Sequence, residues 1–178
     1  MTNPELQYDE AGHDPIETDR DPNASKTIDE RANHCFGCGP ENPYGLHLVF
    51  TTNIKDDTSD PEAITVTAPV RLDAFYEGPP GHIHGGIVAT LLDEAMSKLN
   101  RPFGVLAMTR HMEIDYLRPA PLNQPLVLVG RHLRRDGRKL FHQAELKSAN
   151  GEVLARAKGL FIVLDPALIE AARARGLL

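Results

Sequence analysis

The chain has 178 residues, a net charge of −6 and 41% hydrophobic residues, values that suit one globular domain with a full hydrophobic core. The acidic balance, without a basic face that interleaves aromatic residues, excludes nucleic acid as an expected partner. No apolar run approaches the roughly 18 residues that a membrane span needs, and the acidic start MTNPELQYDE lacks the apolar stretch of a secretory signal. We therefore expect a cytoplasmic protein without membrane insertion.

The beginning of the chain falls into two segments. Residues 1–34 are polar, acidic and without apolar periodicity, so they are predicted to be a flexible segment. The following stretch, CFGCGPENPY, is dense in Gly, Pro and Asn, which indicates a compact loop. Its Cys35 and Cys38 are the two cysteines of the sequence, so no disulfide framework is expected and a reducing compartment fits.

Apolar spacing places the regular elements along the rest of the chain. Alternating residues predict strands near 46–54 and 64–70, with a turn at 55–62 between them. A helix is predicted over 86–100, because its apolar residues follow a helical face and Pro102 bars its continuation. The remaining predicted elements are four strands and a terminal helix, at 104–117, 126–134, 139–148, 152–164 and 166–175. Asp136-Gly137 and Asn150-Gly151 are hairpin signals, and Gly176 is expected to cap the last helix.

This order of elements is an α+β layout. A curved antiparallel sheet wrapped around one central helix satisfies it, because the helix is apolar over much of its circumference. We predict three parts: the flexible segment 1–34, a folded domain over 35–165 and a short C-terminal helical segment over 166–178.

The strongest chemical signal is the stretch HGGIVATLLDEA, which runs from His84 to Ala95. Gly85 and Gly86 begin a helix whose first N–H groups lack partners within the helix. Because glycine has no side chain, a carbonyl oxygen can approach the N–H of Gly86, and the positive end of the helix dipole attracts it. An oxyanion hole has these requirements.

Asp93 lies seven residues after Gly86, which puts both on nearly the same side of the helix, about 10.5 Å apart along its axis. Its neighbours Leu91, Leu92 and Ala95 are apolar, so a carboxylate here needs a reason. The carboxylate could attack a thioester or activate a water, or it could simply bond to a neighbouring strand. The chemistry alone leaves both readings open.

The same stretch carries a resemblance to a known family. GHIHGGIVATLLDEA resembles the PaaI-like branch of the hotdog-fold acyl-CoA thioesterases, in which an HGG turn begins the central helix and an Asp or Glu nine residues after the His is catalytic. Asp93 stands nine residues after His84. The stretches CFGCGPENPYGLHL, EGPPGHIHGG, TRHMEIDYLRPAPL and GRKLFHQAELKSANGEVLARAKGLF are also similar to one subgroup, so the resemblance covers residues 35–164.

The resemblance implies a hotdog fold and hydrolysis of an acyl-CoA to a carboxylic acid and coenzyme A. It implies no cofactor, with coenzyme A only a part of the substrate, and a homo-oligomer, either a dimer or a dimer of dimers. The N–H of Gly86 would polarise the thioester carbonyl, Asp93 would be nucleophile or general base, and Thr109 would hold the attacking water or carboxylate. In this family the site lies between two subunits.

One position departs from the family pattern. Some members carry Asn or Gln six residues before the His, where it bonds to the thioester carbonyl, and this chain has Gly78 there. The second oxyanion donor would then be His82, His84 or a backbone group. His84 is also an alternative general base, although a ring that braces the turn through a backbone carbonyl is the simpler interpretation.

Further residues are candidates for contact with the substrate. They are Gly85 and His82 in the HGG turn, Arg118 at a strand end, and Arg138 and Lys139 beside the Asp136-Gly137 turn. Arginine and lysine can meet the phosphates of coenzyme A. A charged hairpin is, however, usually a solvated edge.

The Cys35-x-x-Cys38 pair suggests zinc or redox chemistry. A structural zinc needs four ligands, and neither His34 nor His47 has the spacing of a known finger. A thioredoxin-like motif would need a βαβ setting, which the predicted elements do not provide. We therefore expect no metal, and a tight loop with two small buried residues.

Two other functions fit parts of the pattern. A hotdog hydratase or dehydratase would act on the acyl chain and not on the thioester. A non-catalytic acyl-CoA sensor of the transcription-factor type would need a DNA-binding domain, for which residues 1–34 are too short and too acidic. A purely structural role would leave Gly85, Gly86 and Asp93 unexplained.

Overall fold

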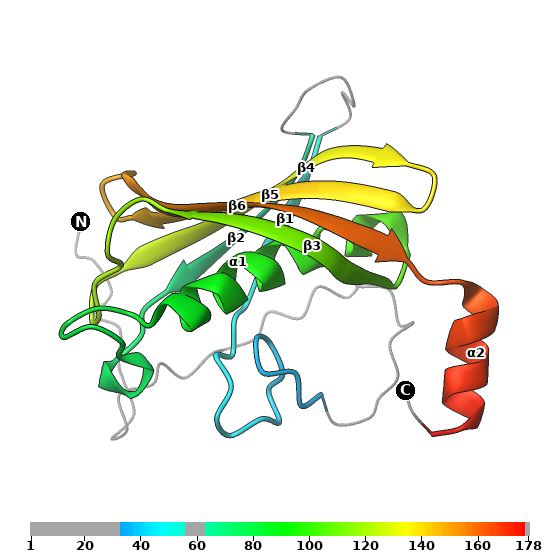
Figure 1. The fold of residues 1–178 in the computed structure, drawn as a ribbon, viewed down its shortest axis with the longest axis horizontal. Coiled ribbons are helices and arrows are strands. Elements are labelled where there is room, and N and C mark those ends of the chain that lie inside the picture. Colours follow the sequence, from blue (N-terminus) through cyan, green and yellow to red (C-terminus); the bar gives the residue numbers. More distant parts are fainter. Residues whose placement is uncertain (1–32, 56–62, 177–178) are drawn as a thin grey trace, which may run out of the picture. The chain divides into compact units, whose positions relative to one another are not determined.

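A computed structural model describes residues 33–55 and 63–176 of the chain. In this part, an antiparallel six-stranded sheet in the order β1-β2-β4-β5-β6-β3 curves over one long helix, α1 (Figure 1). The predicted architecture is confirmed. Most of the predicted flexible segment 1–34 and of the turn 55–62 lies outside the described residues, and the three-part division of the chain stays a prediction.

The strands run close to their predicted positions, with one exception. They are β1 (Thr51–Ile54), β2 (Ile64–Val70), β3 (Ala107–Tyr116), β4 (Leu126–Asp136), β5 (Lys139–Ser148) and β6 (Val153–Val163). The exception is the first, because residues 46–50 are not strand. Leu46 and Leu48 are buried, but their N–H groups bond to the carbonyls of Phe36 and Gly37 at 2.7 and 2.9 Å. Alternation here reflects burial under a loop and not pairing in the sheet.

The central helix α1 (Gly85–Lys98) packs its apolar face on the sheet. Five of its apolar residues are buried: Val88, Leu91, Leu92, Ala95 and Met96. Apart from Ala95, each of these side chains contributes roughly 1.5–3 kcal/mol by leaving water. Two glycines on the sheet allow α1 to pack close to it. A Cβ at Gly130 would lie 3.0 Å from the Ala95 carbonyl oxygen, and a Cβ at Gly159 would lie 2.9 Å from the Met96 sulfur.

The ends of the helices differ little from prediction. α1 begins one residue earlier and ends two residues earlier than predicted. A short 3-10 helix, η2 (Arg101–Phe103), which contains Pro102, follows just beyond the predicted end. A second 3-10 helix, η1 (Ala74–Tyr76), precedes the HGG turn. The terminal helix α2 (Pro166–Ala174) is followed by Gly176 in the left-handed conformation, as predicted. Both hairpin turns are also confirmed, with Gly137 and Gly151 at φ 56° and 88°.

The strand β3 matters most for the site, because it is an edge of the sheet. Its one partner among the described strands is β6, and most of its side chains are exposed. A β-bulge interrupts the ladder near its start, where the pairing passes from Thr109 with Phe161 to His111 with Leu160. Such an extra residue bends a strand and redirects its neighbours. It lies next to the threonine that the resemblance marks.

Candidate active site

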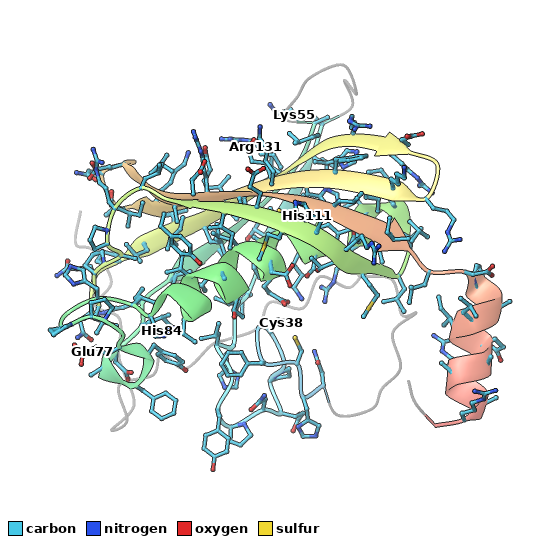
Figure 2. All side chains as sticks on the ribbon, viewed as in Figure 1. Cys38, Lys55, Glu77, His84, His111 and Arg131 are labelled. Carbon is cyan, nitrogen blue, oxygen red and sulfur yellow. The ribbon has the colours of Figure 1, made fainter. Side chains whose placement is uncertain are left out.

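The HGG turn is fixed by hydrogen bonds at the start of α1. The backbone N–H of His84 donates to the Tyr76 carbonyl at 2.9 Å, and the His84 ring caps the helix by accepting from the N–H of Gly86 through Nδ1 at 3.0 Å. Figure 2 shows His84 at this first turn. The ring therefore braces the turn as an acceptor from a backbone N–H, and the predicted bond to a backbone carbonyl is wrong. This satisfies one of the free donors at the helix start.

The two glycines of the turn differ in their contacts. The N–H of Gly86, which the resemblance assigns to the oxyanion hole, is engaged by the His84 ring. The N–H of Gly85 donates to no group in the described part of the chain, and the Gly85 carbonyl accepts from the Tyr116 hydroxyl at 3.1 Å. The helix start therefore offers one open donor and one donor that an exposed imidazole covers.

Asp93 and Thr109 are brought together. The Thr109 hydroxyl donates to Oδ1 of Asp93 at 2.8 Å, across the gap between α1 and β3. Burial raises the pKa of Asp93, the charge of Glu94 raises it further, and the bond from Thr109 opposes both by stabilising the ionised form. A carboxylate with a raised pKa and a fixed orientation is suited to act as a base or nucleophile.

A cleft of about 320 Å³ opens beside the helix start. Gly85, His82, Tyr116 and Arg118 are among its lining residues, and most of the others are apolar. The His82 ring nitrogen Nδ1 lies 2.8 Å from the Pro80 carbonyl oxygen, and the Arg118 guanidinium pairs with Glu152. The cleft therefore combines apolar walls with an arginine and the backbone of Gly85, which suits a ligand with an apolar body and a polar group.

Comparison with known proteins identifies the family. A family model described as "Thioesterase superfamily" matches residues 80–155. The crystal structure of protein RHA08564, a thioesterase superfamily protein, superposes with a TM-score of 0.65 and 34% sequence identity, over 76% of this chain and 68% of that chain. The chain belongs to the thioesterase superfamily. The predicted family and its hotdog fold are thereby confirmed.

Two further proteins are similar to parts of this chain. The bovine protein "Acyl-coenzyme A thioesterase THEM4" (Bos taurus) is 37% identical over 93 residues, which are 52% of this chain. The chain spans 38% of the length of that curated relative. The protein smu.793 from Streptococcus mutans, solved bound to acetyl CoA, has the same fold with a TM-score of 0.57 and 19% identity, over 66% of this chain and 88% of that chain.

This thioesterase-superfamily chain has a structural reason for its glycine at position 78. A Cβ at Gly78 would lie 2.7 Å from the Cα of His84, so the Asn or Gln of other members does not fit this turn without a shift of backbone. The Gly78 N–H is itself bonded to the His82 carbonyl at 3.0 Å. Position 78 is therefore not available as a second oxyanion donor.

The two cations of the β4–β5 hairpin lie away from the HGG turn of the same chain. The Arg138 side chain donates to the Val163 carbonyl at 2.9 Å, and Val163 pairs with Ala107 at the start of β3. Gly85, in contrast, contacts Tyr116 at the end of β3. Arg138 and its exposed neighbour Lys139 are thus at the other end of this strand from the cleft.

One cluster on α1 joins residues that the sequence did not predict to lie together. Cys38 accepts from the Lys98 ammonium at 2.7 Å, and that ammonium lies 2.7 Å from the Glu94 carboxylate. The predicted pair of buried cysteines is wrong for Cys35, which is exposed, while Cys38 is half-buried. The usable signal was Glu94 with Lys98 four residues later, a charged pair on an otherwise apolar helix.

The same cluster argues against dithiol catalysis. Burial and a hydrogen bond to Glu94 raise the pKa of the Cys38 thiol to about 11, although Lys98 lowers it. Reactive cysteines have lowered thiol pKa values, because the thiolate is the nucleophile. For Glu94, burial would raise the pKa, but the bonds from Cys38 and Lys98 and the charges of Lys98 and Arg101 hold it below its usual value.

Within residues 33–55 and 63–176, no helix is both long enough and apolar enough to cross a bilayer.

Proposed function

We propose that this protein hydrolyses an acyl-CoA thioester to a carboxylic acid and free coenzyme A. The observation that carries the proposal is the Asp93 carboxylate, held by the Thr109 hydroxyl at 2.8 Å, on a helix that begins with two glycines. The name of the bovine relative, an acyl-coenzyme A thioesterase, and the acetyl CoA bound to smu.793 support it. The cytoplasmic location stays a prediction from the sequence.

The proposed site is formed by two subunits. Gly86 and Asp93 are seven residues apart on one helix, which separates them by about 10.5 Å along the axis. A nucleophile must come within about 3–3.5 Å of the carbonyl carbon. A thioester bound at the Gly86 N–H is therefore beyond the reach of Asp93 in the same chain, and a second copy must supply the carboxylate.

The exposed edge of β3 provides the means of pairing. In an antiparallel pair related by a two-fold axis, residues on either side of the axis face each other. An axis near Met112 sets Thr109 of one copy close to Tyr116 of the other, and Tyr116 contacts Gly85. This pairing puts Asp93 and Thr109 of one subunit beside the helix start of its partner. We propose a homodimer, or a dimer of such dimers, on this basis.

Each residue then has a step in the reaction. The thioester oxygen accepts from the Gly86 N–H after the His84 ring turns aside, with the open Gly85 N–H beside it as a second donor. Asp93 either attacks the carbonyl carbon to form an anhydride or takes a proton from the water that attacks. In both routes the carbon–sulfur bond breaks, coenzyme A leaves as the thiolate and takes up a proton, and water supplies the new oxygen of the acid.

The candidate binding residues take two positions in this proposal. The cleft beside Gly85, with His82 and Arg118, receives part of the acyl-CoA from its own subunit. Because antiparallel pairing puts the start of one β3 beside the end of the other, Arg138 and Lys139 of the second copy approach the same cleft. There they can meet the phosphates of coenzyme A.

The decisive experiment measures thiol release from a panel of acyl-CoAs by the full chain. We expect hydrolysis of at least one of them, and a fall in kcat of at least about 100-fold in Asp93→Asn with binding retained, since the amide can neither attack nor take a proton. Asp165→Asn is the matched control, because Asp165 is an exposed carboxylate that caps α2, and Asn caps a helix equally well.

Other outcomes would identify the alternatives. Binding of acyl-CoAs without release of thiol from any of them contradicts the proposal and indicates an acyl-CoA-binding protein. Loss of the enoyl absorbance of an enoyl-CoA, again without thiol release, indicates a hydratase. A single turnover in water enriched in 18O separates the two routes of hydrolysis. Direct attack by water puts 18O into the carboxylic acid product. If Asp93 forms an anhydride and water then attacks its aspartyl carbon, the 18O is found in the Asp93 side chain.

A further inference from the structure

Three ligand atoms of the type that metals prefer converge where the CFGCG loop, residues 35–39, packs on α1. Figure 1 shows this part of the chain on the side of α1 away from the sheet, and Figure 2 labels Cys38 there. The sulfurs of Cys35 and Cys38 and a carboxylate oxygen of Glu94 all lie within 4.8 Å of one another. Cys35 Sγ and Glu94 Oε2 are 3.8 Å apart.

These separations are close to those of a tetrahedral zinc site. Zinc binds thiolate sulfur at about 2.3 Å and carboxylate oxygen at about 2.0–2.2 Å, which sets neighbouring ligand atoms about 3.5–3.8 Å apart. The carboxylate is already at this distance from Cys35, so a small contraction of the cluster completes the geometry. Thiolates favour zinc over the harder divalent cations magnesium and calcium.

The glycines of the CFGCG loop indicate that the convergence is built into the fold. A Cβ at Gly37 would lie 2.6 Å from Oε2 of Glu94, so the missing side chain is what admits the carboxylate. A Cβ at Gly39 would lie 2.3 Å from the Asn33 oxygen, and the Gly39 N–H donates to the Cys35 carbonyl at 2.8 Å. Both glycines are needed for the turn that faces the two sulfurs toward Glu94.

Lys98 supplies the charge that a partly buried metal site needs. Its ammonium lies 2.7 Å from both Cys38 Sγ and Glu94 Oε1, and its side chain is only 8% exposed. Two thiolates, one carboxylate, one ammonium and one divalent cation sum to zero charge, which limits the cost of burial. A hydrogen bond from Lys98 to the Cys38 thiolate is the kind of outer contact that orients and stabilises metal ligands.

We propose that Cys35, Cys38 and Glu94 bind one zinc ion, with Lys98 as hydrogen-bond donor to Cys38. No other His, Cys, Asp or Glu of the described residues joins the cluster, so water takes the fourth position. Binding exchanges the two thiol protons for the metal: the cation and two thiols give the dithiolate complex and two protons. The metal ties the CFGCG loop to α1 beside Asp93, and its water-bound fourth position stays open.

This proposal differs from the sequence expectation of no metal for a simple reason. The third ligand, Glu94, stands 59 residues after Cys35, and no ligand spacing near the cysteine pair indicates it. The proposal is independent of the proposed hydrolysis, and its test does not use activity.

The test titrates the full chain, freed of metal under reducing conditions, with cobalt and then with zinc. We expect one cobalt per chain, with the near-ultraviolet thiolate-to-cobalt absorption and the intense visible bands of a tetrahedral site, and displacement of cobalt by zinc. Cys35→Ser is the most informative cysteine variant, because Cys35 is exposed and its replacement spares the core. It should roughly halve the thiolate absorption and weaken binding strongly.

Three further variants distinguish the metal ligand Glu94 from the residues that position it, Lys98 and Gly37. Glu94→Gln should lower the affinity for cobalt by more than about 100-fold, beyond the roughly 10–100-fold expected of an outer contact such as Lys98→Gln. Gly37→Ala should weaken binding too, since it pushes the carboxylate away while keeping every ligand. Glu170→Gln, an exposed glutamate on α2, is the matched control and should bind as the unaltered chain does.

Three results would overturn the proposal. One is cobalt bound only with the weak absorption of an octahedral oxygen site. Another is an affinity that Glu94→Gln leaves unchanged in protein whose circular dichroism shows a native fold. The third is a purified chain without free thiols that regains two on reduction and still binds no metal, which would make the pair a disulfide.

Discussion

Two neighbouring carboxylates on α1, Asp93 and Glu94, are both partly buried, yet their pKa values are displaced in opposite directions. Burial acts on both in the same sense, so the difference comes from their partners. Asp93 meets the neutral hydroxyl of Thr109, whereas Glu94 meets the ammonium of Lys98 at 2.7 Å. Carboxylates whose surroundings separate their pKa values in this way commonly divide the roles between them. The Asp93 side is suited to proton transfer, and the Glu94 side is suited to holding a fixed charge.

The largest effect on stability is expected on the Glu94 side of the helix. Lys98→Met leaves the Glu94 carboxylate without its cation in a site that is 13% exposed. We expect the free energy of unfolding to fall by about 1–3 kcal/mol, the penalty for an unsatisfied buried polar group. Chemical denaturation of the reduced, metal-free protein measures it.

A double variant shows whether the charge is responsible. In Lys98→Met with Glu94→Gln, the lone charge is gone and part of the lost stability should return. If the double variant is as unstable as the sum of the two single variants, the two side chains do not interact and the contrast with Asp93 is lost.

On the Asp93 side, Thr109→Ala should change turnover and its pH dependence together. Loss of one neutral hydrogen bond costs roughly 1–2 kcal/mol, which is about 5- to 30-fold in kcat. The bond from Thr109 lowers the pKa of Asp93, so its removal raises that pKa further. Because the ionised carboxylate is the active form, the acidic limb of the kcat/KM profile should move to higher pH. Thr109→Ser should keep both kcat and the pH dependence of kcat/KM, because the hydroxyl is retained. If Thr109→Ser and Thr109→Ala lose turnover equally, the hydroxyl is not needed and Thr109 is a packing residue.

Asp93→Asn should also make the protein more stable at neutral pH. A group whose pKa is raised by folding contributes stability below its unfolded pKa, and this contribution is lost as pH rises through the folded pKa. At neutral pH the ionised Asp93 is therefore a cost, which the neutral amide removes while it still accepts from Thr109. We expect the free energy of unfolding to rise by about 0.5 kcal/mol or more, as is common when an active-site residue is replaced at the expense of activity. A loss of stability would show that the native carboxylate is favourably held, contrary to the direction of its pKa.

The contrast between these two sides also marks what the sequence could predict. The stretch from His84 to Asp93 is local, so helical spacing alone indicated the helix and the shared side of Gly86 and Asp93. The contacts of Glu94 with the CFGCG loop join residues 59 apart, and no periodicity reports such a contact. The bulge beside Thr109 has no sequence signature, since Arg110 fits the strand pattern as well as its neighbours. The error at residues 46–50 has the same origin, because alternation records which side chains are buried and not what buries them.

The smallest change in stability and turnover is expected from replacement of His84. This variant tests whether His84 acts as the base in place of Asp93. The ring accepts the N–H of Gly86 through Nδ1, so its role in the free protein is that of a helix cap. Asn is among the best capping residues, and His84→Asn should therefore change the free energy of unfolding by only a few tenths of a kcal/mol. Turnover should stay within about 3-fold, since the cap is kept and the base is elsewhere. His84→Ala is the comparison: it loses the cap, at a cost of about 1 kcal/mol, but it uncovers the Gly86 N–H. If His84→Asn is stable and has lost turnover as severely as Asp93→Asn, the imidazole takes the proton and the assignment of Asp93 as the base fails.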